Sequence, residues 1–177
     1  MKDFGLKFID IMIGIVLGLG FQWWTNLQFP WQYLAFIFVY VDIVDYWVDY
    51  SPSVKKFPPK REVDLILDVA IMFSPFLYIY TTQQTILHFL FAFALFSILD
   101  CIWCIRARQE YHPGGTEGKY LTTWIHFNWI QAVIVLAVSG LLLVAGISPL
   151  ATLIVFIAMR IVGRIAASYR YKKVYLA

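Results

Sequence analysis

The sequence has little charge and almost no cysteine. Only 14% of the 177 residues are charged and two are cysteines, whereas 61% are hydrophobic. A soluble domain carries roughly a quarter charged residues and less than about half apolar ones. This shortage of charge excludes an ordinary soluble protein, and we expect no nucleic-acid partner. The longest polar stretches, 51–61 and 106–119, are too short for a separate soluble domain, so the composition predicts one membrane-embedded bundle over 1–177.

The two cysteines stand close together, as Cys101-Ile-Trp-Cys104. A Cys-x-x-Cys pair is typical of a redox centre or of half a zinc site. The flanking sequence is not that of a thioredoxin-like strand and helix, and the chain has no second cysteine pair to complete a zinc site. We therefore interpret both cysteines as free, buried thiols.

Charge is also missing from one side of the hydrophobic segments. Six apolar stretches are near the ~20 residues that cross a ~30 Å hydrocarbon core, with limits at 7–24, 31–50, 62–81, 84–106, 119–145 and 148–169. The turns after the first, third and fifth carry no charge, and all 14 Lys and Arg and all 11 Asp and Glu lie on the other side. The positive-inside rule places that side in the cytoplasm. The sequence thus predicts an all-α, multi-pass protein of the cell (inner or plasma) membrane, with six transmembrane helices as three hairpins and both termini cytoplasmic.

Acidic residues cluster inside these predicted helices. Asp42, Asp45 and Asp49 are spaced i, i+3, i+7 and share one helix face. Four further acids lie at similar depth on neighbouring segments: Asp10, Asp64, Asp68 and Asp100. A lone carboxylate inside a bilayer costs a few kcal/mol, so these groups must be paired, hydrated, metal-bound or protonated.

The basic residues at comparable depth are too few to neutralise seven acids. They are Arg160 and Arg164, with His126 as a third candidate. We therefore favour a cation vestibule, and its expected residues are Asp10, Asp42, Asp45, Asp68, Asp100 and His126. The alternative is a purely structural layer of ion pairs.

The first predicted helix has two faces of interest. Gly14 and Gly18 give it a small-residue face, which suits close packing within a subunit, close packing between subunits, or a narrow pore wall. Asp10, Ile13 and Leu17 form a stripe at helical spacing. We expect this stripe to line a conduit with an acidic mouth, where Ile13 and Leu17 form the pore constriction; ordinary helix packing is the alternative.

Two short motifs carry a family resemblance. Phe8-Ile9-Asp10 opens the first segment, and an aromatic stretch ending in Tyr46-Trp47 closes the second. With six helices and both ends inside, this pattern resembles the prokaryotic relatives of the endolysosomal potassium channel. That family opens its first helix with Phe-Ser-Asp and lines its pore with apolar residues of the same helix, whereas this chain has Ile9 in place of the Ser and Phe4 in place of an expected Arg. The resemblance implies a potassium channel.

A second pattern involves four of the acids. Asp42-Ile-Val-Asp45 and Asp64-Leu-Ile-Leu-Asp68 resemble the acidic motifs of the CDP-alcohol phosphotransferases, which are also six-helix proteins. The resemblance implies that Asp42, Asp45, Asp64 and Asp68 hold one or two divalent cations that bind a diphosphate and position the attacking hydroxyl. Tyr46 replaces the glycine that admits the nucleotide, so the enzyme would be a diverged one.

Three functions follow from these patterns. We favour a homo-oligomeric channel or carrier that has the lipid bilayer and a small cation as its partners and needs no cofactor. The second is a membrane enzyme that depends on a divalent cation. The third is a non-catalytic partner or immunity-type protein, in which the acids belong to a structural ion-pair layer.

Overall fold

The computed structural model describes the backbone of residues 2–170 and the side chains of residues 9–142, 144 and 146–170. It is 90% helical, with no strand in the part described, so the all-α prediction is confirmed. Two 3₁₀ segments, η1 (Phe21–Asn26) and η2 (Thr81–Gln83), follow the first and third helices. The helices are α1 (Lys2–Gly20), α2 (Pro30–Lys56), α3 (Glu62–Tyr80), α4 (Ile86–Tyr111), α5 (Gly115–Ala145) and α6 (Pro149–Arg170).

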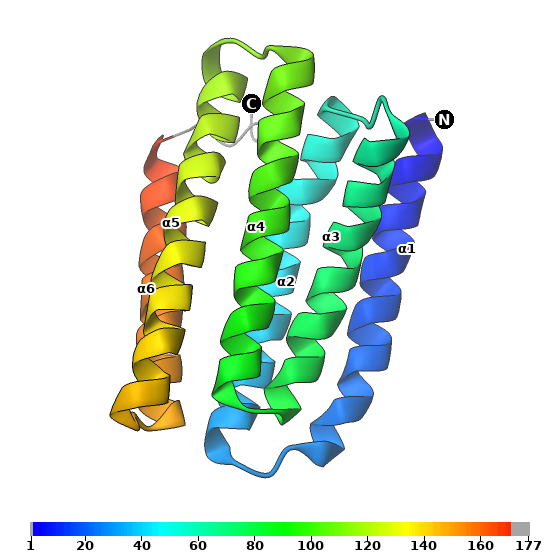
Figure 1. Ribbon diagram of the computed structural model, residues 1–177. Coiled ribbons are helices and arrows are strands. Elements are labelled where there is room, and N and C mark those ends of the chain that lie inside the picture. The colour runs from blue at the N-terminus through cyan, green and yellow to red at the C-terminus, as the bar shows by residue number, and fades with distance from the viewer. Residues whose placement is uncertain (1, 171–177) are drawn as a thin grey trace.

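The helices form an antiparallel bundle (Figure 1). The connections after α1, α3 and α5 lie at one end, which we call the neutral end because those segments carry no charge. The other connections lie at the opposite end, the charged end. The helix α4 packs against α3 and α5, whereas α1 packs against α2 and α3, and α6 packs against α5 and α2.

Four helices, not the six expected, combine the length and the apolar composition needed to cross a membrane within the described residues. They are α3 extended by η2, α4, α5 and α6. In α1, Lys7 and Asp10 interrupt the apolar run. In α2, Asp42, Asp45 and Asp49 do the same. The acidic residues of α1 and α2 thus lower the mean hydropathy of these two helices.

The first helix ends earlier than predicted, at Gly20 instead of residue 24. Here the Tyr40 hydroxyl donates to the Leu17 carbonyl in the last turn of α1 (2.7 Å). The Gly20 backbone also lies close to α3, because a Cβ at this position would come within 2.9 Å of Ile79 Cδ1. The chain then tightens into η1 and turns toward α2.

Two prolines lie inside helices. Pro75 in α3 has no N–H for the Ile71 carbonyl, and the Ser74 hydroxyl donates to that carbonyl instead, at 2.8 Å. Pro52 lies near the end of α2, which continues to Lys56, six residues beyond the predicted limit. The helix therefore reaches well into the charged end.

Aromatic rings fill the core toward the neutral end. We call Tyr78, Phe89, Phe93 and Phe156 the aromatic cluster; all four side chains are at most 4% exposed. The ring centroids of Phe93 and Phe156 are 4.8 Å apart, and those of Tyr78 and Phe89 are 5.0 Å apart. The cluster joins α3, α4 and α6 and leaves the polar residues on its charged-end side.

Candidate functional site

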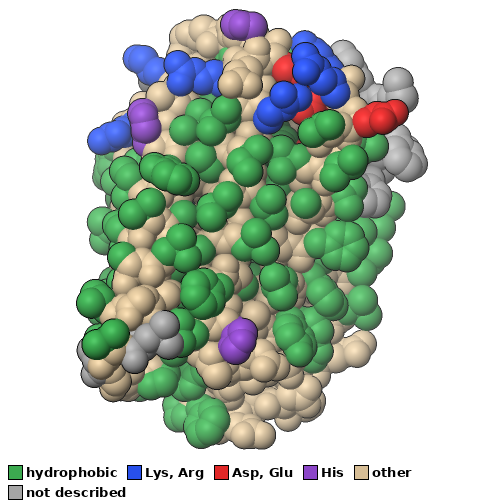
Figure 2. Space-filling view, viewed as in Figure 1, with side chains coloured by type: hydrophobic (Ala, Val, Ile, Leu, Met, Phe, Trp, Pro, Cys, Tyr) green, Lys and Arg blue, Asp and Glu red, His purple; other side chains and the backbone are tan. Residues whose placement is uncertain are grey.

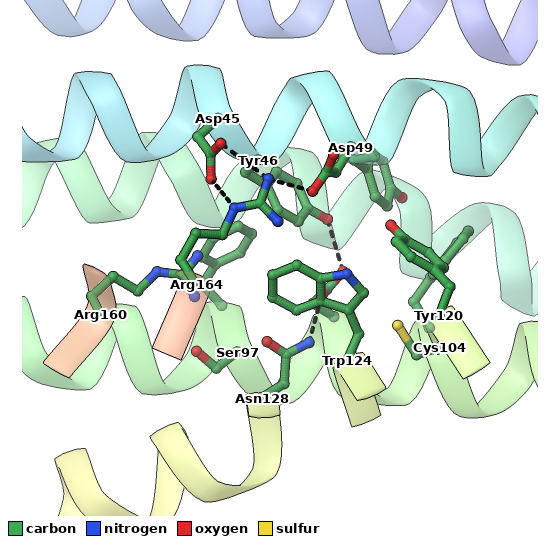
Figure 3. Close-up of a pocket in the computed structure, with 14 residues that line it drawn as sticks. Asp45, Tyr46, Asp49, Ser97, Cys104, Tyr120, Trp124, Asn128, Arg160 and Arg164 are labelled. Atoms are coloured by element: carbon green, nitrogen blue, oxygen red, sulfur yellow. Dashed lines mark hydrogen bonds and ion pairs between the residues drawn. The ribbon is translucent and has the colours of Figure 1, made fainter. Parts of the chain in front are cut away.

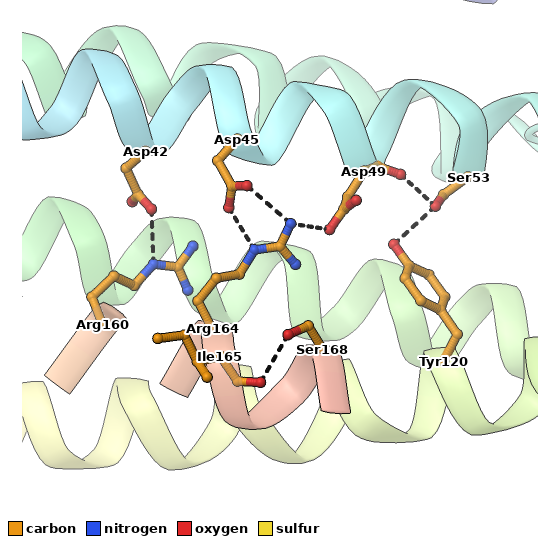
Figure 4. Close-up of polar contacts among 9 residues, drawn as sticks. All are labelled: Asp42, Asp45, Asp49, Ser53, Tyr120, Arg160, Arg164, Ile165 and Ser168. Carbon is orange, nitrogen blue, oxygen red and sulfur yellow. Dashed lines mark hydrogen bonds and ion pairs between the residues drawn. The ribbon is translucent and has the colours of Figure 1, made fainter. Parts of the chain in front are cut away.

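The face of α2 that carries three acids is turned toward α6 (Figure 4). Asp42, Asp45 and Asp49 succeed one another by about one helical turn, and so do Arg160 and Arg164. Because the two helices lie side by side, the two series match turn for turn. We call these five residues, together with Asp68 of α3 and Asp100 of α4, the polar core.

The deepest ion pair joins Arg160 to Asp42. Arg160 Nε is 2.9 Å from Asp42 Oδ1, and each residue is only 6% exposed. Arg160 also donates from Nη1 to Gln131 Oε1 (2.8 Å), and its guanidinium lies 5.4 Å from the Phe93 ring centre. A Cβ on Gly163 would meet Gln131 Nε2 at 2.6 Å. The glycine thus makes room for the amide that supports Arg160.

Arg164 bridges the other two acids of α2. Its Nε and Nη2 contact the two carboxylate oxygens of Asp45 at 2.6 and 3.0 Å, and Nη2 also contacts Asp49. The guanidinium lies 5.2 Å from the ring centre of Trp124. Such a bidentate contact between an arginine and a carboxylate is one of the stronger types of side-chain hydrogen bond. Arg164 therefore holds α6 to α2 at two successive turns.

Asp100 is held differently, by neutral donors. The Tyr46 hydroxyl donates to Oδ1 at 3.0 Å and the Asn128 amide donates to Oδ2 at 2.5 Å. Asp100 is 8% exposed. No Lys or Arg of the described part of the chain is within ion-pair distance of it. The carboxylate is thus held by hydrogen bonds, and Arg160 acts on its charge only from beyond ion-pair distance.

Asp68 has the same kind of environment. It accepts hydrogen bonds from the Tyr50 hydroxyl (2.9 Å) and the Trp103 indole, and it is 4% exposed. It too lacks a cationic partner among the residues described. The rings of Tyr46 and Tyr50 stack with centroids 5.0 Å apart. Two stacked tyrosines one turn apart on α2 therefore lie between Asp68 and Asp100, and each donates a hydrogen bond to one of them.

A small cavity lies among these residues (Figure 3). Its volume is about 30 Å³, enough for about two water molecules. Its polar lining includes the carboxylates of Asp45, Asp49 and Asp100 and the guanidinium groups of Arg160 and Arg164. The charged groups of α2, α4 and α6 thus surround one cavity large enough for about two water molecules.

Three buried polar atoms lack a hydrogen-bond partner within the described residues. They are Asp42 Oδ2, the Tyr78 hydroxyl and Gln131 Nε2. Asp42 and Gln131 both contact Arg160, and Tyr78 belongs to the aromatic cluster. The unpaired atoms therefore lie where the polar core meets the aromatic cluster. Burying a polar atom without a hydrogen bond costs folding free energy.

The structure brings together only part of the expected vestibule. Asp42, Asp45, Asp68 and Asp100 belong to the polar core, but Asp10 is exposed and accepts a hydrogen bond from the Trp47 indole at 2.9 Å. His126 is exposed too and lines a separate groove on α5. These last two residues do not join the others in one site.

The residues expected to form a constriction point into the subunit. Ile13 is 6% exposed, and Leu17 is partly buried against the hydrophobic core. A neighbouring face of α1 carries Gly14 and Gly18, around which an added Cβ would meet nothing within 4 Å. Within one subunit, the stripe on α1 is therefore packing surface.

The four acids of the metal-site alternative have separate partners. Asp42 and Asp45 pair with arginines of α6, and Asp68 accepts from Tyr50. Asp64 pairs with Arg106 of α4, whose Nη2 is 2.7 Å away. Within the described residues, no group of three or more His, Cys, Asp or Glu side chains is close enough to hold a metal ion.

The cysteines are free and buried, as predicted. Cys104 lines the cavity, and Cys101 donates to the Ile125 carbonyl, with 3.6 Å between sulfur and oxygen. Two residues that contact the polar core were missed from the sequence, Asn128 and Gln131. Their signal was available, because they are the only amides in the stretch 119–145 and stand three residues apart, on one helix face.

Comparisons with known proteins add no family. No protein-family model matches the chain, and neither a curated protein nor a solved structure is significantly similar to it.

Proposed function

We propose that the chain is a multi-pass membrane protein that moves a small cation, a proton included, through its polar core. One observation carries the proposal: Asp68 and Asp100 are buried carboxylates without a cationic partner among the described residues, and Asp100 borders a water-sized cavity. An ionised carboxylate in a low-dielectric interior requires a counter-charge or a proton. A transported cation supplies that charge.

The balance of charge supports this assignment. Three arginines, Arg106, Arg160 and Arg164, are paired with carboxylates of the helices. Six inward-facing acids oppose them: Asp42, Asp45, Asp49, Asp64, Asp68 and Asp100. With every group ionised, three negative charges remain uncompensated. A layer built only for structure would need no such excess.

The aromatic cluster supplies the constriction in this proposal, in place of Ile13 and Leu17. Phe93 is fully buried, and Phe156 is 4% exposed. Their rings close the core on the neutral-end side of Arg160. Apolar constrictions of this kind block ions until they widen or become wet. On this proposal, the pathway is closed toward the neutral end until these rings move apart.

We also propose that all six helices lie in the bilayer, with the charged end in the cytoplasm. The outward surfaces of α1 and α2 are apolar, because Ile11 is 60% and Val41 is 64% exposed. The positive-inside rule supports the orientation. Single cysteines introduced at Thr25 and Thr116, at opposite ends, should react with impermeant reagents from opposite sides of intact cells. Labelling of both from the same side would contradict six spans.

We further propose that the protein is a homo-oligomer and that potassium is a candidate for the transported ion. The open face around Gly14 and Gly18 allows a helix of a second copy to approach closely, which supports a homo-oligomer. The likeness of the Phe8-Ile9-Asp10 motif to the potassium-channel relatives makes potassium the first metal cation to test, beside the proton.

The test is ion flux into liposomes that contain the purified protein. An imposed gradient should drive potassium or protons inward faster than in protein-free liposomes. Asp100→Asn should remove the difference, whereas Glu117→Gln, a surface carboxylate paired with Lys56, should not. If liposomes with well-folded wild-type protein take up ions no faster than protein-free liposomes, the proposal is wrong. Folding is checked by thermal unfolding in detergent, because the structural-layer alternative predicts a loss of stability alone.

A further inference from the structure

A second polar site lies outside the polar core, at the charged end of α4, α5 and α6. It is a groove of about 570 Å³ lined in part by Arg108, Lys119, His126 and Arg170. Figure 2 shows basic and histidine side chains gathered at the upper left, over α5, with no acidic side chain among them. The residues that line the groove include no Asp or Glu. Three helices thus contribute positive charge to one concave surface.

These basic groups differ from others at the same end. Lys56 pairs with Glu117 at 2.7 Å, and Arg61 with Glu110 at 3.1 Å. Arg108 and Lys119, in contrast, are exposed and have no carboxylate of the described residues within ion-pair distance. Several positive charges that share a concave site without internal partners create a potential that attracts an anion.

The backbone adds to this potential. Helix α5 begins at the groove, and its N-cap residue Gly114 makes no side-chain cap. The first N–H groups of a helix and its dipole favour an anion. Gly118 is required here, because a Cβ would lie 2.5 Å from the Pro113 carbonyl oxygen. The turn therefore folds tightly against the first turn of α5.

Arg170 is positioned by its packing. Its guanidinium lies 5.7 Å from the ring centre of Phe127, on the side of α5 that faces α6. His126 lies seven residues beyond Lys119, about 10 Å along the helix at ~1.5 Å per residue. The groove thus runs from the end of the bundle about two turns toward its middle. That height matches the headgroup region of a bilayer in which the helices lie.

We propose that this groove binds the phosphate of an anionic phospholipid. The shared chemistry is a phosphate oxygen held by guanidinium, ammonium and helix N–H donors. The lipid is favoured over a soluble phosphate compound because the helices that form the groove expose apolar side chains, among them Ile130, one turn beyond His126 on α5, and Ile165 on α6. A bound lipid would place its phosphate in the groove and its chains on that surface.

The experiment measures binding of phosphatidylglycerol and phosphatidylcholine to the full-length protein in detergent by native mass spectrometry. Phosphatidylglycerol should bind at least tenfold more tightly. A basic residue near a membrane contributes about 1 kcal/mol, or about fivefold, so Arg108→Gln with Lys119→Gln should weaken this binding by roughly 25-fold. The matched control, Lys55→Gln with Lys60→Gln, removes the same charge outside the groove and should leave binding unchanged.

A further pair, Arg108→Lys with Lys119→Arg, retains the charge and should retain the preference. Equal binding of the two lipids, or an equal loss in the matched control, would overturn the proposal. Full displacement of phosphatidylglycerol by millimolar inorganic phosphate would also overturn it, because the ligand would then be a soluble phosphate compound.

Discussion

Replacing Arg160 by methionine should destabilise the protein severely. Arg160 and Asp42 are each only 6% exposed and lie 2.9 Å apart. Removal of the guanidinium leaves Asp42 with both oxygens unpartnered, since Oδ2 has no hydrogen bond already, and it removes the donor to Gln131. Breaking a buried pair in this way costs about 3–5 kcal/mol, because one charge stays behind without compensation.

Replacing both partners should cost much less. In Asp42→Leu with Arg160→Met, no buried charge remains, and apolar replacement of an ion pair is often neutral or stabilising by about 1–4 kcal/mol. The double variant should therefore be at least about 3 kcal/mol more stable than Arg160→Met alone. Arg108→Met is the matched control; it is exposed and should cost less than about 0.5 kcal/mol.

The assay is reversible unfolding in mixed micelles by increasing sodium dodecyl sulfate, followed by the fluorescence of the seven tryptophans. Two results would contradict a costly unpaired charge at Asp42. One is a cost below about 1 kcal/mol for Arg160→Met, which would mean that water or another group already neutralises Asp42. The other is a double variant no more stable than the single one.

Three smaller predictions use the same unfolding assay. Gly163→Ala places a Cβ 2.6 Å from Gln131 Nε2 and should cost about 1–3 kcal/mol; no loss would mean that the amide moves freely. Ser74→Ala removes the hydroxyl that donates to the Ile71 carbonyl, which the buried proline of α3 deprives of its helical N–H, and should cost about 1 kcal/mol; a neutral result would place water there. Lys56→Gln breaks the pair with Glu117, in which both side chains are 38% exposed, and should cost less than about 1 kcal/mol; a larger loss would show that this surface pair orders the loop.

The sequence was sufficient to predict which end of the bundle each segment faces. Helix type, the alternation of neutral and charged connections and the free cysteines follow from local composition, and the structure agrees with all three. It also predicted that Arg160 and Arg164 lie at the depth of the acids. Depth depends only on position along a helix, so one segment at a time is enough to predict it.

Lateral arrangement could not be predicted in that way. Asp42 and Arg160 are 118 residues apart, and their contact depends on which faces of α2 and α6 meet. The stripe with Ile13 was expected to line a conduit, but the same periodicity also describes a face that packs inside the subunit, and the structure has it there. His126 has the expected depth but lies on the outer side of α5.

The most direct test of the central claim is ion flux in liposomes for Asp100→Asn and for the exchange Asp100→Asn with Asn128→Asp. Both residues line the cavity and are hydrogen-bonded to each other, so the exchange keeps one carboxylate at the same place. Liposomes with the single variant should pass ions no faster than protein-free liposomes, and the exchange should restore part of the wild-type flux. Undiminished flux in a folded Asp100→Asn protein would contradict it.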